Sequence, residues 1–545
     1  MKHYLFCAAL CLVAFSAVRA QQSQESVQPL SKKAVKGYIY GINKTDNGGL
    51  IVTYKIAGDN KQDVSFETYA FNKRLQFISS NDANIAKEDK EDKVKTLVYA
   101  TVGGCTSFDI LSMKLNLHKR VLQKSWDHDK QQYVTTKVIS DEVIKAKNDA
   151  GKAYKGFASY LSSGDAGDTF IIAANDKTEK KQANPFFILQ LSPNLDITEK
   201  TIDVAGNQSL VYCDQLENDD VIMVFAPKKG EGDPSQYTYL RYSIKGELKS
   251  KVPFTSPSTN LLIMDARELN GAVYFCATST KSKDAYSEVF EDYASILNPC
   301  FKEQLNDQDL RWQNKSNQKM ESFHLLKFRD DKLIFASTSP IADFKSKFRA
   351  SGKGASAYKG TKFSINKFFV TADEEFLIAG QLTSRAMLGS GYGALGNTPT
   401  VTSVKTYQDI ICMHFDKNGQ LKAQYGVERI NDDKKSEIFS IEQNFYLGSD
   451  GKTLYWELLE AKGQKGYAGF MDAMNGNLTY YPHYFPRIAK INLSNTSVSD
   501  FAILGDKKYY LRKNFTGIFD EKENSITYVG HDEDYKKLWV SKYNF

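Results

Sequence analysis

Short glycine-rich segments are the parts of this 545-residue sequence that most resemble nucleotide sites. The segment Gly391–Gly396 matches GxGxxG, and Gly451-Lys452-Thr453 resembles the end of a phosphate-binding loop. A dinucleotide site needs a strand before the glycines and a helix opening on them, so that the pyrophosphate meets the helix N-terminus. A proline and a β-rich stretch follow the first motif, and Tyr446 stands where the second needs its first glycine. We interpret the two motifs as a loop and a hairpin turn.

Acidic and histidine-containing segments are the corresponding candidates for metal binding. The sequence has no HExxH motif, and its polar clusters are Asp127–Asp129 and His531–Asp534. The segment Asp416–Gly419 begins like a calcium loop but lacks the ligands that should follow. Charged, solvated turns explain all three segments, so we expect no metal and no cofactor.

Catalytic residues stay unknown at this point. The sequence contains no GxSxG motif and offers no Ser/His/Asp or Cys/His set by spacing. A carboxylate pair for glycoside chemistry has no preferred position along the chain.

Aromatic side chains are plentiful, with 31 Tyr and 33 Phe, and they gather near position 480. An aromatic ring with a polar tip suits protein or sugar surfaces. The residues that we expect to bind a partner are Tyr467, Phe470, Tyr480, Tyr481, Tyr484 and Phe485, with Trp312 and Tyr392 from two other long segments.

A recurring hairpin unit must position these residues. In Asp409–Gly426, apolar side chains alternate over a strand, Asp416–Gly419 supplies a turn, and Leu421 begins the return strand. The same pattern recurs at Phe66–Leu75, Phe108–Leu117, Phe186–Leu195, Tyr239–Leu248, Phe323–Leu333, Ile488–Val498 and Leu538–Phe545. Additional strands before most copies indicate about four strands per unit.

Repetition of small antiparallel sheets in a fixed order is typical of a propeller. The chain resembles generic β-propellers over nearly all of residues 21–545, without a WD, kelch or other family motif. The resemblance implies an all-β propeller of eight four-stranded blades, or seven with one irregular unit. Two unrelated β-domains are the alternative. The mean period of about 65 residues exceeds the roughly 40–50 of regular propeller repeats, because long insertions interrupt the units.

Three insertions lie between the second and third strands of consecutive units: Ser279–Lys319, Ser384–Thr406 and Ala461–Pro482. In an antiparallel four-stranded blade, these connections leave the same face of the ring. We expect an amphipathic helix at Tyr286–Leu297 in the first and a glycine-rich loop in the second. Helical spacing also predicts a helix within Lys124–Lys155, and Ser80–Lys95 is expected to be a charged loop or helix.

The first twenty residues have the features of a secretory signal peptide. Lys2 precedes the apolar run Tyr4–Val18, and Ala20 ends a segment of tolerated cleavage residues. The run is short for a membrane span, and no later segment is long and apolar enough to be one. This leader, the strands rich in Lys, Asn, Tyr and Phe, and the Gln-rich segment after residue 20 resemble secreted envelope proteins of the Bacteroidota. The resemblance implies a periplasmic, outer-membrane-associated or extracellular protein.

Charge and cysteine content limit the function further. The formal charge of +6 falls to about +4 without Lys2 and Arg19, and no basic stripe indicates a nucleic-acid reader. Five cysteines follow the leader at irregular spacing, which favours buried thiols over a disulfide framework, although a Cys276–Cys300 bridge remains open.

These observations predict a non-catalytic scaffold that presents an aromatic loop surface to an envelope or outer-membrane protein. The alternative is an extracellular enzyme or binding module that uses the same face for glycans. The last unit stops at its turn, so we also predict that Glu25–Ala34 pairs beside Leu538–Phe545 and closes the ring. Pro29 fits such an edge strand because it has no N–H to donate.

Overall fold

The structure is a computed structural model. It describes residues 24–56, 63–86, 90–102, 115–127, 132–148, 151–161, 169–174, 186–192, 194–204, 206–290, 319–352, 355–389, 401–430, 436–467, 478–511 and 517–544. The predicted signal peptide at residues 1–20 lies outside these ranges.

The local unit of the fold is a strand followed by a tight turn that a polar side chain organises. In the opening hairpin, Asp416 Oδ1 accepts hydrogen bonds from the backbone N–H groups of Asn418 and Gln420, each at 2.9 Å. The Gly419 N–H donates to the Asp416 carbonyl, and Gly419 takes a positive φ of 75°. The same arrangement recurs with Asn72 and Leu75, Ser192 and Leu195, Ser243 and Gly246, and Asp532 and Tyr535.

Four sheets contain four antiparallel strands each. They are β2–β5 (Tyr38–Lys44, Leu50–Ile56, Asp63–Phe71, Phe77–Ala86), β9–β12 (Lys155–Leu161, Thr169–Ala174, Phe186–Leu191, Ile197–Thr201), β13–β16 (Gln208–Gln215, Val221–Pro227, Gln236–Tyr242, Leu248–Thr255) and β17–β20 (Leu262–Leu269, Ala272–Thr280, Met320–Arg329, Lys332–Pro340). Each of these sheets is a hairpin meander in chain order.

Three other sheets depart from this count. One has three strands, β6–β8 (Lys93–Val102, Leu115–Asp127, Gln132–Lys145). Another places β22–β25 (Phe363–Val370, Phe376–Gly389, Val401–Phe415, Leu421–Val427) beside β21 (Phe348–Ser351), which runs parallel to β25. The largest contains β26–β33 (Glu442–Leu447, Thr453–Tyr467, Leu478–Asn492, Ala502–Ile503, Tyr509–Leu511, Ile518–Asp520, Ser525–Asp532, Lys537–Asn544) together with β1 (Gln24–Pro29).

The helical segments among the described residues are short. They are α2 (Lys32–Val35), α3 (Tyr286–Val289) and the 3₁₀ turns η1 (Ile341–Lys345) and η2 (Gly505–Lys507). None of the described helices has the length and apolar character needed to cross a membrane.

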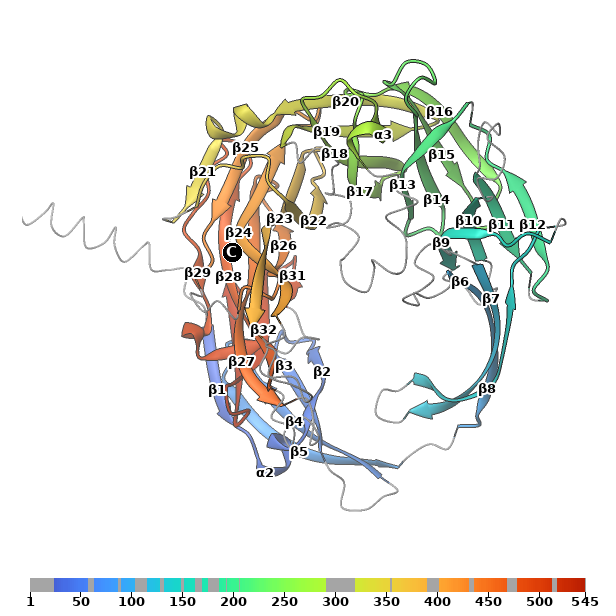
Figure 1. The fold of residues 1–545 in the computed structure, drawn as a ribbon. Coiled ribbons are helices and arrows are strands. Elements are labelled where there is room, and N and C mark those ends of the chain that lie inside the picture. Colours follow the sequence, from blue (N-terminus) through green and yellow to red (C-terminus); the bar gives the residue numbers. More distant parts are fainter. Residues whose placement is uncertain are drawn as a thin grey trace, which may run out of the picture.

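Apolar clusters join neighbouring sheets, and Figure 1 shows the sheets following one another in chain order around a ring. One cluster contains Leu377 of β23 together with Leu454 and Trp456 of β27. Another packs Val52 of the first sheet against Val540 of the last strand. The protein is therefore an all-β propeller. The described strands form seven hydrogen-bonded sheets, and the largest contains two repeat units linked through β30, so the count of eight blades stays a prediction.

The predicted closure by the N-terminal segment is confirmed. Strand β1 pairs antiparallel with β33, from Gln24 opposite Lys542 to Pro29 opposite Lys537. The pairing is shorter than predicted, because Ser31 instead caps α2 by accepting a hydrogen bond from the Ala34 N–H.

The predicted helices are largely wrong. Within Lys124–Lys155, residues 132–145 instead form β8, which pairs antiparallel with β7. Half of the residues in β8 are β-branched, and cross-strand pairing satisfies the backbone of the strand. Helix α3 covers only the first turn of Tyr286–Leu297, and residues from 291 onward lie outside the described ranges. In Ser80–Lys95, β5 continues to Ala86 and β6 begins at Lys93.

Candidate functional site

Two long hairpin arms stand on the face predicted to carry the insertions. Strand β23 continues beyond its pairing with β22, and Ser384–Gly389 pairs with Val401–Thr406 of β24. Strand β27 continues beyond β26, and Glu460–Tyr467 pairs with Leu478–Phe485 of β28. The described parts of these two insertions are therefore strand extensions where loops were expected. Both arms leave the second-to-third-strand end of adjacent units.

The predicted binding residues do not form one continuous surface among the described residues. Tyr480 and Tyr481 lie on the second arm opposite Lys465 and Gln464, and Tyr467 lies opposite Leu478. Trp312, Tyr392 and Phe470 lie outside the described residues.

Phe485 corrects the expectation of an all-exposed aromatic run. Its side chain is only 2% exposed and its ring centroid lies 6.4 Å from that of Tyr510. Phe485 is thus a core residue, because the neighbouring strand β30 covers it. Tyr484 is half-buried, and burial raises the pKa of its phenol.

A buried ion-pair group anchors the base of the second arm. The Glu460 carboxylate on β27 is fully buried and accepts a 2.7 Å hydrogen bond from Arg487 Nη1 on β28. Arg429 Nε lies 3.5 Å from the other carboxylate oxygen, and burial lowers the pKa of Arg429. Arg429 also donates to the carbonyls of Tyr407 and Ser436. Arg429 therefore contacts both arms at their base, through Tyr407 of β24 and Glu460 of β27.

A second polar group lies where β28, β30 and β32 meet. His483 and His531 have ring centroids 6.1 Å apart, and His531 stacks on Tyr535 at 3.9 Å. Tyr510 lies 5.1 Å from His483 and its hydroxyl accepts a hydrogen bond from Lys462 Nζ at 3.1 Å. Burial lowers the pKa of His483, so its imidazole is neutral at pH 7. We name this set of five residues the imidazole cluster.

The imidazole cluster brings together residues from two sequence segments that we interpreted separately. His483 belongs to the aromatic run, whereas His531 belongs to the polar segment His531–Asp534. Asp532 confirms the turn interpretation of that segment, since its Oδ1 accepts from the N–H groups of Lys536 and Lys537. Asp450 accepts from the N–H of Thr453, so Gly451-Lys452-Thr453 is a hairpin turn, as predicted. Residues 128 and 129 of the polar segment Asp127–Asp129 lie outside the described residues, so its interpretation as a turn stays a prediction. The segment Gly391–Gly396 lies outside the described residues.

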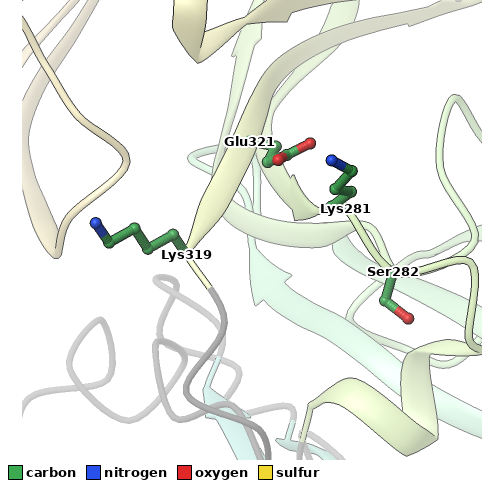
Figure 2. Close-up of a pocket in the computed structure, with 4 residues that line it drawn as sticks. All are labelled: Lys281, Ser282, Lys319 and Glu321. Atoms are coloured by element: carbon green, nitrogen blue, oxygen red, sulfur yellow. The ribbon is translucent and has the colours of Figure 1, made fainter.

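A third feature is a pocket at the base of the β18–β19 connection. It has a volume of about 450 Å³ and is lined by Lys281, Ser282, Lys319 and Glu321. Figure 2 shows Lys281 and Glu321 pointing toward one another, while Lys319 points away. The lining is charged and open to solvent.

A buried Ser–His pair lies on the strands beside this pocket. Ser279 Oγ is 2.8 Å from His324 Nε2, and His324 Nδ1 is 3.1 Å from Thr338 Oγ1. Burial lowers the pKa of His324 to about 4. The group that orients the imidazole is a neutral hydroxyl instead of the carboxylate of a catalytic triad. The three side chains form a polar link across β18, β19 and β20.

Cysteine and acidic side chains complete the inventory of reactive groups. Cys213, Cys276 and Cys412 are buried in strands, as predicted for thiols that act as small apolar residues. No three His, Cys, Asp or Glu side chains of the described chain are arranged to hold a metal ion.

No protein-family model matches this chain, and no curated protein does. Among solved structures, similarity extends to the β-propeller domain of the trilobed protease from Pyrococcus furiosus, with 8% identity, 94% of each chain covered and a TM-score of 0.23. A eukaryotic initiation factor gives 10% identity, 94% and 91% coverage and a TM-score of 0.25. The Synechocystis apocarotenoid oxygenase is 10% identical, with 88% of this chain and 93% of the oxygenase chain covered and a TM-score of 0.25. Similarities this low assign neither a family nor an activity.

Proposed function

We propose that the protein is an exported, non-catalytic propeller that uses its two hairpin arms to hold a protein partner in the cell envelope. The observation that carries the proposal is the second arm, in which Glu460–Tyr467 and Leu478–Phe485 extend beyond the sheet on a buried base. Loops and extensions on a rigid scaffold are common places for binding residues. A protein partner suits this arm because Tyr467, Tyr480 and Tyr481 are placed along it.

The base of the arm supports binding in preference to chemistry. Glu460 and Arg487 are paired with each other, which removes them from reaction with a substrate. Lys462 is held by Tyr510, and that hydrogen bond raises the pKa of its ammonium group. Such groups position the arm and lower the entropy lost when a partner docks.

The test is affinity capture from the native envelope, followed by mass spectrometry of the captured proteins. The variant replaces Tyr467, Tyr480 and Tyr481 with Ala. We expect it to recover its main partner at least about tenfold less well than the natural chain, because aromatic anchors are each worth roughly 1–2 kcal/mol. Its melting temperature should stay close to that of the natural chain.

Two further variants control for unfolding and for general loss of aromatic surface. Phe485→Ala should lower the free energy of unfolding by about 3 kcal/mol, since it empties a core position. Tyr38→Ala removes an exposed ring from the first sheet and should leave capture unchanged. Equal capture by the triple variant and the natural chain would contradict the proposal. A bound species that survives protease treatment and is displaced by glycans would instead identify the glycan-binding alternative.

A further inference from the structure

Strand β8 is an open sheet edge far from the hairpin arms. It is the outermost strand of the three-stranded sheet β6–β7–β8, and among the described residues it pairs with β7 alone. At 14 residues it is one of the longest described strands. Figure 1 shows β7 and β8 as a long curved ribbon.

The side chains of β8 are exposed on both faces. Every residue from Thr135 to Lys145 is exposed, in contrast to edge strands such as β16, where buried positions alternate with exposed ones. Four of the exposed residues are apolar and β-branched, with exposed fractions between 41% and 51%: Val138, Ile139, Val143 and Ile144. A long exposed edge of this composition is a template for pairing with another strand.

The part of β8 that suits such pairing is its C-terminal half. The register with β7 is continuous from Ser140 opposite Val121 to Lys145 opposite Asn116. The irregularities lie before it, where Ile139 falls between two paired positions. A regular segment of six residues therefore faces outward without a bulge or proline to block a partner.

We propose that this segment pairs antiparallel with the same segment of a second copy of this chain, around a two-fold axis at Val143. In that register Asp141 lies opposite Lys145 of the second copy, Lys145 lies opposite its Asp141, and the two Val143 side chains meet. A register centred on Asp141 or on Glu142 instead places two carboxylates against each other, which is unfavourable. The charges of the segment therefore select one self-complementary register.

The existing contacts of Asp141 agree with this arrangement. Arg120 Nη2 donates to its Oδ2 at 2.5 Å, which fixes the carboxylate on the sheet surface. That hydrogen bond also lowers the pKa of Asp141, so the charge persists well below pH 7. The ammonium group of the opposing Lys145 extends this ion pair across the two copies.

Sedimentation over a range of protein concentrations tests the proposal with the intact exported chain. The natural chain should move from monomer toward dimer mass as concentration rises. Val143→Lys places two ammonium groups against each other at the axis, so it should remain a monomer throughout. The matched control is Val94→Lys on β6, at the opposite edge of the sheet, where the valine is 66% exposed against 51% for Val143; this variant should dimerise normally. A natural chain that is monomeric at every concentration overturns the proposal, as does loss of the dimer in the Val94 variant.

Cysteine cross-linking tests the register and does not depend on a disruptive substitution. Val143→Cys should form an intermolecular disulfide under mild oxidation, because the two side chains meet at the axis. Val138→Cys should not, since in this register the two copies of residue 138 are ten positions apart, roughly 33 Å. The natural chain sets the background from its own cysteines. Equal cross-linking of the two variants, or none above background at Val143, overturns the proposed pairing.

Discussion

Half-buried Glu375 and buried His414 show how neighbouring groups set the pKa of a side chain. Glu375 Oε2 lies 2.7 Å from His414 Nε2, and Oε1 lies 2.6 Å from Lys422 Nζ. Burial lowers the pKa of His414, so the neutral ring donates from Nε2 while Nδ1 lies 3.1 Å from the Tyr425 hydroxyl. Burial alone raises the pKa of Glu375, but its bonds to His414 and Lys422 outweigh it and lower that pKa to about 2.

This low pKa predicts a specific dependence of stability on pH. A carboxyl group with a lowered pKa stabilises the folded state above its ordinary pKa, and the contribution disappears as the pH falls toward the folded value. Glu375→Gln should therefore lower the melting temperature at pH 7, and its difference from the natural chain should shrink between about pH 5 and pH 2. Thermal melts at several pH values measure this. Asp373→Asn, two residues earlier and exposed, is the control; a constant difference for Glu375→Gln across the range would contradict the assignment.

The imidazole cluster shows a different residue-scale principle. Two histidines 48 positions apart in the sequence come within ring-contact distance, because β30 joins β28 to β32. Neither histidine is distinctive by its own neighbours in the sequence. The surroundings of His483 become distinctive only when β30 adds Tyr510 and the turn after β32 adds Tyr535.

At the scale of the element, the five-residue turn is the repeated part. A polar residue at its first position accepts backbone hydrogen bonds, and the fourth position takes a positive φ. Glycine fills that fourth position in some turns, whereas Leu75 and Leu195 fill it in others and are buried. The left-handed conformation is unfavourable for leucine, so burial of these two side chains offsets the strain.

Replacing the glycine at this fourth position should destabilise two of the turns by different amounts. A Cβ at Gly419 would lie 2.3 Å from Ser337 Oγ, whereas a Cβ at Gly151, with a similar φ of 74°, would meet nothing within 4 Å. Gly151→Ala should cost about 1 kcal/mol from backbone strain, and Gly419→Ala should cost about 1–3 kcal/mol more through crowding. Urea unfolding followed by circular dichroism compares them. Equal losses would show that Ser337 moves aside freely.

The hairpin arms are a second feature at the scale of the element, and they result from strand pairing that continues beyond the sheet. Once β23 and β24 pair, their hydrogen bonds continue past the sheet for as long as the chain offers strand-forming residues, as at Val401–Thr406. In the second arm, the described residues Lys462–Tyr467 and Leu478–His483 pair as strands with each other alone. The buried ion pairs of Glu460 with Arg487 and Arg429 at its base therefore add the rigidity that further strands provide inside the sheet.

At the scale of the whole molecule, the two ends of the chain close the ring. Strand β1 covers the open edge of β33, and charged pairs join the first sheet to the last, Lys44 to Asp520 at 2.6 Å and Lys73 to Glu523 at 2.9 Å. Ser31 adds a further link, since its N–H donates to the Tyr69 hydroxyl at 3.0 Å.

Deletion of residues 21–34 should therefore lower the melting temperature by several degrees and increase aggregation, because it exposes the β33 edge. Differential scanning calorimetry and light scattering measure the two effects. Deletion of residues 21–23 alone ends before β1 and should change neither. If the longer deletion leaves stability and solubility intact, then the ring is held closed by other contacts.

The sequence by itself determined the features that depend on neighbouring residues. Alternation at period two predicted most strands, polar and glycine residues predicted the turns, and the incomplete last unit predicted its pairing with the N-terminal segment. These signals are local, because a strand's two faces and a turn's hydrogen bonds involve residues a few positions apart. The closing strand could also be predicted from the sequence, since each of the other repeat units continues past its turn into a further strand.

Only the tertiary structure decided which surfaces are covered. Phe485 has the same sequence surroundings as its aromatic neighbours, yet β30 buries it. Strand β8 has helical spacing, but pairing with β7 holds it extended. Burial and pairing depend on segments tens to hundreds of residues away, and the energy of packing against them exceeds the small local preferences that a single sequence displays.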